Sequence, residues 1–305
     1  MDIQIGGNSK GAGKRLLLFF IAWIAVLAAV YNLTGQSFPY GELSGALWLF
    51  PGLLVLLALT SFLYWFSLSS IGIRLSMKEL AGLYLVVTTL DFLSGQMLPV
   101  GEAAGVAYIS KKRDNADKTA LWAWAGALVL SSWAGFGIAA GLAVLLAVCG
   151  VGVSAIYSIL CVAMAFALGE KIFGFVPSAI RLFGRGAEHF CNENLARIFG
   201  KMVLVQALLF IFTGFLFGAW AGQAVDVGTV SRNAAGYYVS FIASTGVGVI
   251  PGVFESINLL QAHIGIIKSA SIVVYAGIFQ LVFFWLPLAA GIPYVLSGAS
   301  PKSVI

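Results

Sequence analysis

Long stretches without a charged side chain constrain this chain more than any other feature of its sequence. Residues 16–41, 119–169 and 202–225 contain no Asp, Glu, Lys or Arg. A helix needs about 20 apolar residues to cross the hydrocarbon core of a bilayer. The chain is 60% hydrophobic and 10% charged, whereas soluble domains have about 25% charged residues. We therefore expect an all-α, polytopic integral membrane protein without a soluble catalytic domain.

The uncharged windows predict a helical bundle of about eight segments in a single transmembrane domain over residues 1–305. Its first half covers about residues 14–148 and its second half about residues 150–296. The expected segments are residues 16–33, 47–69 and 80–110, two helices within 119–169 joined by a turn at 149–152, and then residues 202–225, 233–267 and 270–290.

The placement of basic residues predicts the topology through the positive-inside rule. We place the N-terminus in the cytoplasm and let residues 80–110 enter and leave the membrane on one side. All but Arg232 and Lys268 of the 17 Lys and Arg residues then face the cytoplasm. This predicts a multi-pass protein of the inner (cytoplasmic) membrane with both termini in the cytoplasm. The charge bias does not decide on which side residues 233–267 lie.

Two glutamates lie inside apolar segments, each just after a proline and a glycine. A carboxylate at bilayer depth costs at least ~2.5 kcal/mol, and a proline frees backbone groups that protein or water must satisfy. Because both halves carry this pattern, we expect two broken, re-entrant hairpins in an inverted repeat, with a binding site between them. The residues of the pattern are Pro99, Gly101 and Glu102 in the first half, and Pro251, Gly252 and Glu255 in the second.

Each glutamate falls in or near the first turn of a new half-helix, since proline favours the first helical position. Free backbone N–H groups and the positive end of the helix dipole stabilise a carboxylate there. Glu102 and Glu255 are therefore either self-satisfied helix caps or functional groups. In the functional interpretation they take up and release protons, bind a cationic headgroup, or fix basic residues that hold a phosphate.

Asp91 lies on the same segment as Glu102, shortly before Pro99. There it could share a proton or a hydrogen bond with Glu102, because two close carboxylates seldom ionise together. The structural alternative is that Asp91 faces a polar pocket with Thr88 and Thr89. The sequence leaves both interpretations open.

Other candidate binding residues flank the two hairpins. Lys111, Lys112 and Arg113 follow the first hairpin, where a phosphate arriving from the cytoplasmic side would meet them. Such clusters also anchor hairpins without binding a ligand. Asn258 follows Glu255 at helical spacing and would line the second hairpin. We find no metal-ligand pattern, nucleotide loop or nucleophile constellation, so we expect no metal, no cofactor and no enzyme. The scattered basic residues argue against nucleic acid.

Three motifs follow one another along nearly the whole chain: Pro99-Val-Gly-Glu102-Ala-Ala with a basic turn, Pro251-Gly-Val-Phe-Glu255, and a terminal span with Phe284-Trp-Leu-Pro287 and Gly291. In this order and spacing they resemble the lysylphosphatidylglycerol synthase transmembrane family of flippase-like integral membrane proteins. The resemblance implies a helical bundle with two hairpin halves that moves a lipid between leaflets. Because the aminoacyl-transferase domain of the bifunctional relatives is not found here, lysine transfer to phosphatidylglycerol is not expected.

Two positions depart from the family's pattern. Gly105 stands where the family often has an arginine, just after Glu102. Gln280 stands where the family commonly has another arginine, about seven residues before the proline of the last span, Pro287. Both changes remove phosphate-binding charge from the bundle interior. We therefore expect the substrate to differ from an anionic phospholipid, or its phosphate to be held elsewhere, and Gln280 remains a candidate binding residue.

These features together predict a translocase for a membrane lipid or a lipid-linked substrate. An anionic phospholipid and a polyprenyl-linked lipid are the candidate partners. One alternative is a proton-coupled secondary transporter of a small soluble metabolite that uses the same carboxylates. The other is a non-transporting membrane partner of a lipid-modifying or glycosyltransferase enzyme. An oligomer or a partner enzyme is compatible with each of the three.

Overall fold

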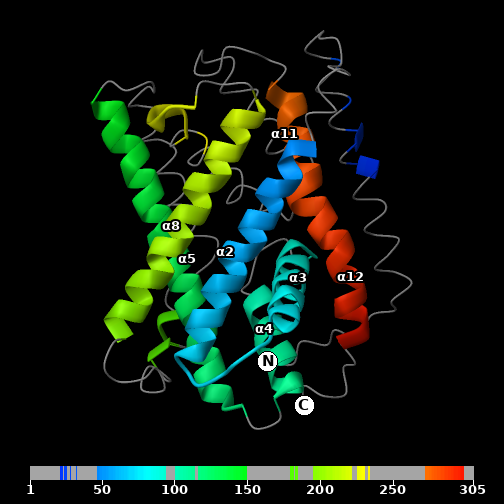
Figure 1. The fold of residues 1–305 in the computed structure, drawn as a ribbon, viewed down its shortest axis with the longest axis vertical. Coiled ribbons are helices and arrows are strands. Elements are labelled where there is room, and N and C mark those ends of the chain that lie inside the picture. The colour runs from blue at the N-terminus through cyan, green and yellow to red at the C-terminus, as the bar shows by residue number, and fades with distance from the viewer. Residues whose placement is uncertain are drawn as a thin grey trace.

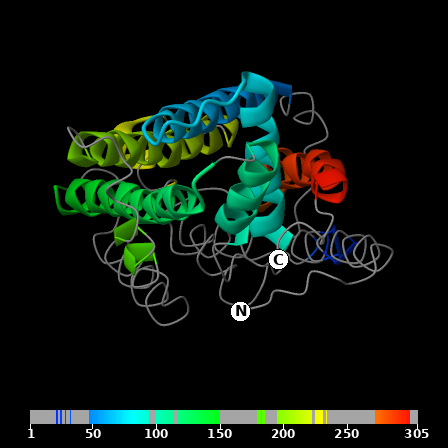
Figure 2. The same cartoon turned by 90° about the horizontal axis from the view of Figure 1, so that it is seen from below.

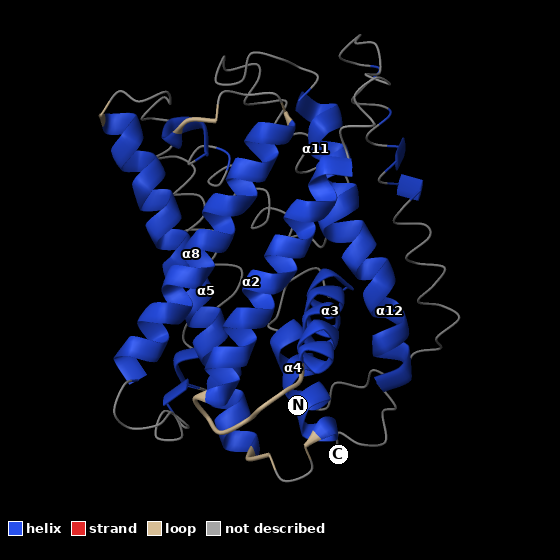
Figure 3. Ribbon diagram, viewed as in Figure 1, coloured by secondary structure: helices blue, strands red, loops and turns tan. Residues whose placement is uncertain are grey.

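The computed structural model describes residues 47–93, 100–113, 116–149, 195–221 and 272–298, with short stretches between 21 and 32, 179 and 184, and 225 and 233. These residues form helices and turns, and no strand occurs among them (Figure 3). Three of the described helices are long and apolar enough to cross a membrane: Leu49–Ser69, Ala196–Trp220 and Val274–Val295. The expected class, an all-helical membrane protein, is confirmed at this level.

Two helices follow the uncharged windows closely. Helix α2 (Leu49–Ser69) fills the span predicted at residues 47–69. Helix α5 (Lys118–Val148) ends at the predicted turn, since Cys149 is the first residue after it. The second helix expected within 119–169 lies outside the described residues.

Helix α8 (Leu195–Trp220) begins well before residue 202, where the uncharged window starts. Arg197 and Lys201 lie on its first turns, and both side chains are exposed. Long basic side chains near the end of a membrane helix can extend to the aqueous interface. These two charges therefore limit the uncharged window in the sequence, although the helix itself includes both residues.

The last span extends beyond the predicted residues 270–290. It consists of α11 (Ile272–Gln280), a π-helical turn η3 (Leu281–Trp285) and α12 (Leu286–Gly298). Pro287 lacks an N–H, and a proline ring crowds the carbonyl one turn earlier. The wider π turn lies directly before Pro287 and accommodates this crowding. Single π turns of this kind are a recognised cause of kinks in a helix.

Helices α3 (Met77–Leu93) and α4 (Val100–Lys112) form a hairpin in the lower half of the molecule as Figure 1 shows it. Helices α2, α5 and α8 extend further along the long axis, and so does the last span, which runs through α11, η3 and α12 (Figure 1). Seen from below, the hairpin lies between the group of α2, α5 and α8 on one side and α12 on the other (Figure 2). Helix α3 contacts α12 and α2, and α4 contacts α5. The hairpin therefore packs between α2 and α5 on one side and the last span on the other.

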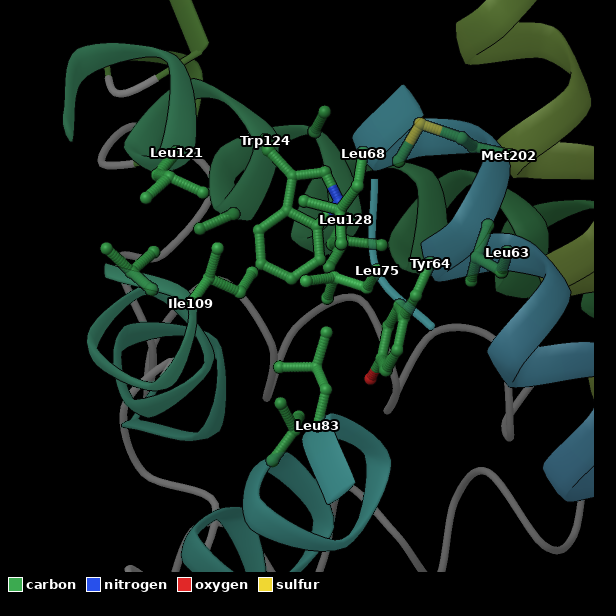
Figure 4. Close-up of a cluster of buried hydrophobic side chains, with 14 of the residues drawn as sticks. Leu63, Tyr64, Leu68, Leu75, Leu83, Ile109, Leu121, Trp124, Leu128 and Met202 are labelled. Atoms are coloured by element: carbon green, nitrogen blue, oxygen red, sulfur yellow. The ribbon is translucent and has the colours of Figure 1, made fainter. Parts of the chain in front are cut away.

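A hydrophobic cluster around Trp124 joins α2, α3, α4, α5 and α8 (Figure 4). The indole N–H of Trp124 donates a 2.9 Å hydrogen bond to Ser67 Oγ. Ser67 in turn donates to the carbonyl of Leu63 at 2.6 Å. Tyr64 packs edge-on against the indole, with ring centroids 5.8 Å apart. These contacts fix α2 against α5 and give the hairpin a packed wall.

Helix α8 is held on two sides. A Cβ on Gly135 of α5 would lie 2.7 Å from Gln206 Cβ and 2.8 Å from the backbone nitrogen of Ala207. Only glycine allows α5 and α8 to approach this closely. On another face of α8, Phe217 packs edge-on against Phe279 with ring centroids 5.4 Å apart. The phenylalanine contact joins α8 to α11, so the last span is fixed to the same bundle.

Candidate functional site

Both outer ends of the α3–α4 hairpin meet at one end of the bundle. The Arg113 guanidinium, just after α4, donates to Glu79 Oε2 at 3.3 Å and to the Arg74 carbonyl at 3.1 Å. Glu79 also accepts hydrogen bonds from the Ser76 backbone N–H at 2.8 Å and the Ser76 hydroxyl at 2.9 Å. This is a capping box, which starts α3. The chain therefore enters and leaves the hairpin at the same end, which we call its base.

The tip of the hairpin brings Asp91 of α3 to the first turn of α4. Asp91 Oδ1 accepts a 2.6 Å hydrogen bond from the backbone N–H of Gly101. First-turn N–H groups have no partner within their own helix, so Asp91 caps α4 from the neighbouring helix. Gly101 is buried, and a Cβ on it would occupy the position of the Asp91 carboxylate. The approach of Asp91 therefore explains the glycine of the first motif.

Glu102 lies beside this cap, in the first turn of α4 as the sequence predicts. Its side chain is partly buried, like that of Asp91, and the two carboxyl groups are within electrostatic range of each other. Among the described residues, none forms an ion pair with Glu102. The tip thus concentrates two acidic groups at a helix N-terminus, where backbone N–H groups and the helix dipole favour negative charge.

Tyr64 of α2 lies close to the same carboxyl groups. It is only 6% exposed, and its phenol is within electrostatic range of Glu102, Asp91 and Tyr84. In Figure 4 its hydroxyl points away from Leu68, toward the side of the cluster where Leu83 of α3 lies. A third helix therefore contributes a polar group to the hairpin tip.

Two threonines of α3 lie on different sides of the helix. Thr88 interacts with the hydroxyl of Tyr84, one turn earlier. Thr89 is fully buried, and its hydroxyl has no hydrogen-bond partner among the described residues. Tyr84 and Thr88 therefore pair with each other along α3, whereas Thr89 faces the last span.

Helix α12 approaches α3 at Gly291. A Cβ on Gly291 would collide with the Thr89 hydroxyl and would lie 2.7 Å from the carbonyl oxygen of Leu85. Only a glycine permits this contact. The terminal motif of the chain thus packs directly on the helix that carries Asp91.

Gly105 is buried where α3, α4 and α5 meet. A Cβ on it would lie 3.1 Å from Val87 Cγ2, 3.3 Å from Leu83 Cδ1 and 3.6 Å from the Trp124 ring. An arginine side chain does not fit such close packing. Close packing therefore accounts for a glycine, and for the absence of a long side chain, at this position.

The basic cluster lies at the opposite end of α4 from Glu102. The rise of 1.5 Å per residue puts Lys112 about 15 Å from Glu102 along the helix axis. Arg113 binds the base of the hairpin, as described above, and Lys112 Nζ lies 6.0 Å from the centroid of the Tyr108 ring. Lys111 and Lys112 are exposed. One small headgroup at the tip therefore does not reach this cluster.

Gln280 ends α11 directly before η3 and is partly buried. It lies on the last span, which also carries Gly291. The remaining predicted site residues lie outside the described part of the chain: Pro99, Pro251, Gly252, Glu255 and Asn258. The structure therefore describes the first half of the expected site and leaves the second half as a prediction.

Sequence reasoning did not identify Tyr64, because α2 reads as a uniformly apolar window. A signal was present in the spacing. Ser61, Tyr64 and Ser67 follow one another every three residues, and all three are buried. Residues three apart lie on the same side of a helix. A buried polar stripe on one face of a membrane helix indicates contact with another polar element of the protein.

Among the described residues, no group of three or more His, Cys, Asp or Glu side chains is placed to hold a metal ion. Comparisons of the chain with protein-family models, with curated proteins and with solved structures gave no match. The groups that the structure describes at or near the tip are the carboxyl groups of Asp91 and Glu102, the Tyr64 phenol and the N-terminus of α4.

Proposed function

We propose that this protein is a flippase-like integral membrane translocase, which moves a lipid or a lipid-linked substrate between leaflets at the tip of the α3–α4 hairpin. It acts without covalent chemistry, in the inner membrane, with both termini in the cytoplasm. One observation carries the proposal. Asp91 and Glu102 hold two carboxyl groups at the tip of a short helical hairpin that packs between α2 and α5 on one side and the last span on the other.

The dimensions of the hairpin support a re-entrant position. Helix α3 has 17 residues and α4 has 13, which correspond to about 25 Å and 20 Å. Neither length covers the hydrocarbon core of about 30 Å. Since the exposed, charged base belongs at the aqueous face, the tip ends part-way across the membrane. Ionisable groups at such a depth are functional by default, and broken helices line the substrate sites of many transporters.

The second motif, around Pro251 and Glu255, is proposed to form a matching hairpin from the opposite face. This completes the eight segments and the inverted repeat. Lys268→Cys and Lys302→Cys, each in a background without native cysteines, test it by labelling with an impermeant thiol reagent. We expect Lys268→Cys to label from outside and Lys302→Cys only after the membrane is opened. Cytoplasmic labelling at position 268 contradicts the inverted repeat.

Transport is tested in liposomes that contain the purified protein and tail-labelled fluorescent lipids of the phospholipid and polyprenyl-linked classes. Dithionite added outside bleaches label that has reached the outer leaflet. We expect Asp91→Asn and Glu102→Gln each to slow this movement about tenfold or more. A hydrogen bond to a charged group contributes about 1.5–3 kcal/mol, and 1.4 kcal/mol corresponds to a factor of ten.

Glu79→Gln is the matched control, because it removes a carboxylate at the base of the same hairpin. Glutamine preserves the capping box, so we expect flux close to wild type. Unchanged flux in both tip variants contradicts the proposed role of the carboxyl groups. Loss of flux in all three variants assigns the effect to hairpin stability instead.

The same acid pair also suits a proton-coupled transporter of a soluble metabolite. That function predicts no lipid movement by the wild type, together with uptake of a solute that depends on a pH gradient. A non-transporting partner predicts that tip variants change co-purification with an enzyme while flux is absent throughout. Each result replaces the translocase proposal with a specific alternative.

A further inference from the structure

We propose that α8 carries a binding site for an anionic phospholipid of the membrane, whose phosphate contacts Arg197 and Lys201. One acyl chain of this lipid lies along the apolar part of the same helix face, at Leu204 and Leu208. The site is on a different helix from the two carboxyl groups of the hairpin tip. It goes beyond the proposed translocase function and does not depend on whether the protein moves lipids.

The residues of this face follow one another along α8 at helical spacing. Arg197 and Lys201 are exposed on the first turns of the helix, and Leu204 and Leu208 are 57% and 46% exposed. Residues three or four positions apart lie on the same side of a helix. The face therefore begins with two positive charges and continues as an apolar strip, which Phe215 extends with 41% exposure.

The two basic side chains are placed to hold one phosphate. Arg197 and Lys201 lie about 6 Å apart along the helix axis, four residues at the usual helical rise. An arginine guanidinium binds phosphate oxygens in pairs, and a lysine attracts them as a point charge. Long basic side chains near the end of a membrane helix extend to the interface, where a phospholipid holds its phosphate. The order of charge and apolar strip along α8 therefore matches the order of headgroup and acyl chain in a lipid.

Gly200 leaves open space beside the basic pair. It is exposed on the same face, three residues after Arg197 and directly before Lys201. A Cβ on Gly200 would meet no described atom within 4 Å. A headgroup can therefore approach the backbone of α8 between the two basic side chains.

A shared hydrophobic cluster places this basic pair at the same end of the bundle as the other basic residues. One member of the cluster from each of four regions lies within three residues of an exposed Lys or Arg. These members are Leu75, Ile109, Leu121 and Met202 (Figure 4). Helices α5 and α8 both begin in the lower part of Figure 1. The start of α8 therefore belongs to a basic end of the molecule.

This end of the bundle attracts negative charge as a whole. Every described Lys and Arg falls within residues 74–118 or 181–201, and all of them are exposed. Among the described residues of these stretches, the acidic side chains outside the hairpin tip are Glu79 and Asp117. Each already accepts a backbone N–H at the start of a helix, at 2.8 Å. Basic residues close to a membrane surface attract anionic lipids, so charge complementarity favours an anionic phospholipid as the occupant of the α8 face.

Binding is tested by native mass spectrometry of the purified protein in a gentle detergent. Dioleoyl phosphatidylglycerol and dioleoyl phosphatidylcholine compete, because they share their acyl chains and differ in net charge. Arg197→Gln combined with Lys201→Gln removes the basic pair. Arg74→Gln combined with Lys78→Gln is the matched control, since it removes two exposed charges four residues apart from the same end of the bundle.

We expect the wild type to bind phosphatidylglycerol about tenfold or more tightly than phosphatidylcholine. The variant without the α8 pair should lose this preference, and the control pair should keep it. Gly200→Leu tests the same site without a change of charge. It should weaken phosphatidylglycerol binding about tenfold, because its side chain fills the place of the headgroup. Gly141→Leu, at another glycine with open space around its Cβ, should bind like wild type.

The melting temperature of each variant in detergent should stay near that of the wild type, because the changed side chains are exposed. Equal losses in the two charge-pair variants overturn the inference, since binding then follows the total charge of this end. Equal binding of both lipids by the wild type overturns it too, and so does a Gly200→Leu variant that binds like wild type. Water-soluble glycerol phosphate that competes as well as the lipid would mean that the site recognises free phosphate, which contradicts a lipid site.

Discussion

Asp91 caps the first turn of α4 by accepting the backbone N–H of Gly101 at 2.6 Å. One helix of the hairpin thereby closes the start of the other, at the break that the sequence predicts around Pro99. The same carboxyl group lies within range of Glu102 and Tyr64. Stability of the hairpin and chemistry of the tip therefore depend on one contact.

The first prediction concerns the space between these two residues. Gly101→Ala should destabilise the protein by about 1–3 kcal/mol, the usual result of overpacking a filled site, because the new methyl group displaces the Asp91 carboxylate. Asp91→Ala should destabilise it by about 1.5–3 kcal/mol through loss of the charged hydrogen bond. Denaturation in detergent measures both changes.

The double variant separates this explanation from a general effect on the helix. Removing the carboxylate makes room for the methyl group, so the two changes together should destabilise less than their sum, with a coupling of about 0.5–3 kcal/mol. Gly141→Ala is the control, because a Cβ there meets nothing within 4 Å. It should leave stability unchanged or raise it by up to about 1 kcal/mol. Strict additivity contradicts the steric account.

The second prediction concerns the contact between the last span and the hairpin. Gly291→Ala should destabilise by about 1–3 kcal/mol, since the methyl group collides with the Thr89 hydroxyl and approaches the Leu85 carbonyl. Thr89→Ser retains the hydroxyl and should not rescue it, whereas Thr89→Ala should rescue it in part. Thermal denaturation of the single and double variants checks this order.

Composition and charge placement were enough to predict the helical membrane class and the span of α2. These properties follow from the polarity of a window of residues, which can be read directly from the chain. The predicted helix boundaries were less accurate where the nearest charged residue does not mark the end of a helix. Arg197 and Lys201 precede the uncharged window that begins at residue 202, yet both lie within α8. The last helix also continues through Pro293.

The site was predictable only in part, for a geometric reason. Glu102 was recognised because a buried acid after a proline is unusual in local sequence. For Asp91 the sequence left open Glu102 or a pocket with Thr88 and Thr89, and it did not indicate the Gly101 backbone N–H, because that contact depends on the register of α3 against α4. Tyr64 is distant from both along the chain, and only the packing of α2 on the hairpin brings it near. Contacts between helices, unlike polarity, are not encoded in a single window.

The third prediction concerns the position where the resembling family often has an arginine. Gly105→Arg should not create a phosphate site, because a Cβ at this position already lies 3.1 Å from Val87 Cγ2. We expect loss of stability of about 3 kcal/mol or more, at the upper end of overpacking effects. Gly105→Ala should show a smaller loss, since the neighbouring side chains need shift only a little. A stable Gly105→Arg variant that binds phosphatidic acid more tightly contradicts this explanation.

The fourth prediction is a pH dependence at the base of the hairpin, where Glu79 lies outside the proposed membrane segment. The hydrogen bond from the Ser76 backbone N–H lowers the pKa of Glu79 below its ordinary value of 4.5, and the Ser76 hydroxyl and the charge of Arg113 act in the same direction. A lowered pKa in the folded protein means that the ionised form is favoured by folding. The stabilisation is therefore fully present above the ordinary glutamate pKa, and it is lost as the pH falls through the lowered value.

Glu79→Gln provides the measurement, because it retains an acceptor for the capping box and cannot ionise. The difference in unfolding free energy between wild type and this variant should be constant at neutral pH and should shrink as the pH falls below about 4.5, the ordinary pKa of the group. The difference should also be smaller in high salt, because the ion pair between the exposed Arg113 and the partly exposed Glu79 is screened. A difference that grows on acidification would mean that the protonated form of Glu79 is the one that stabilises the base. That result would contradict the capping geometry from which the pKa direction follows.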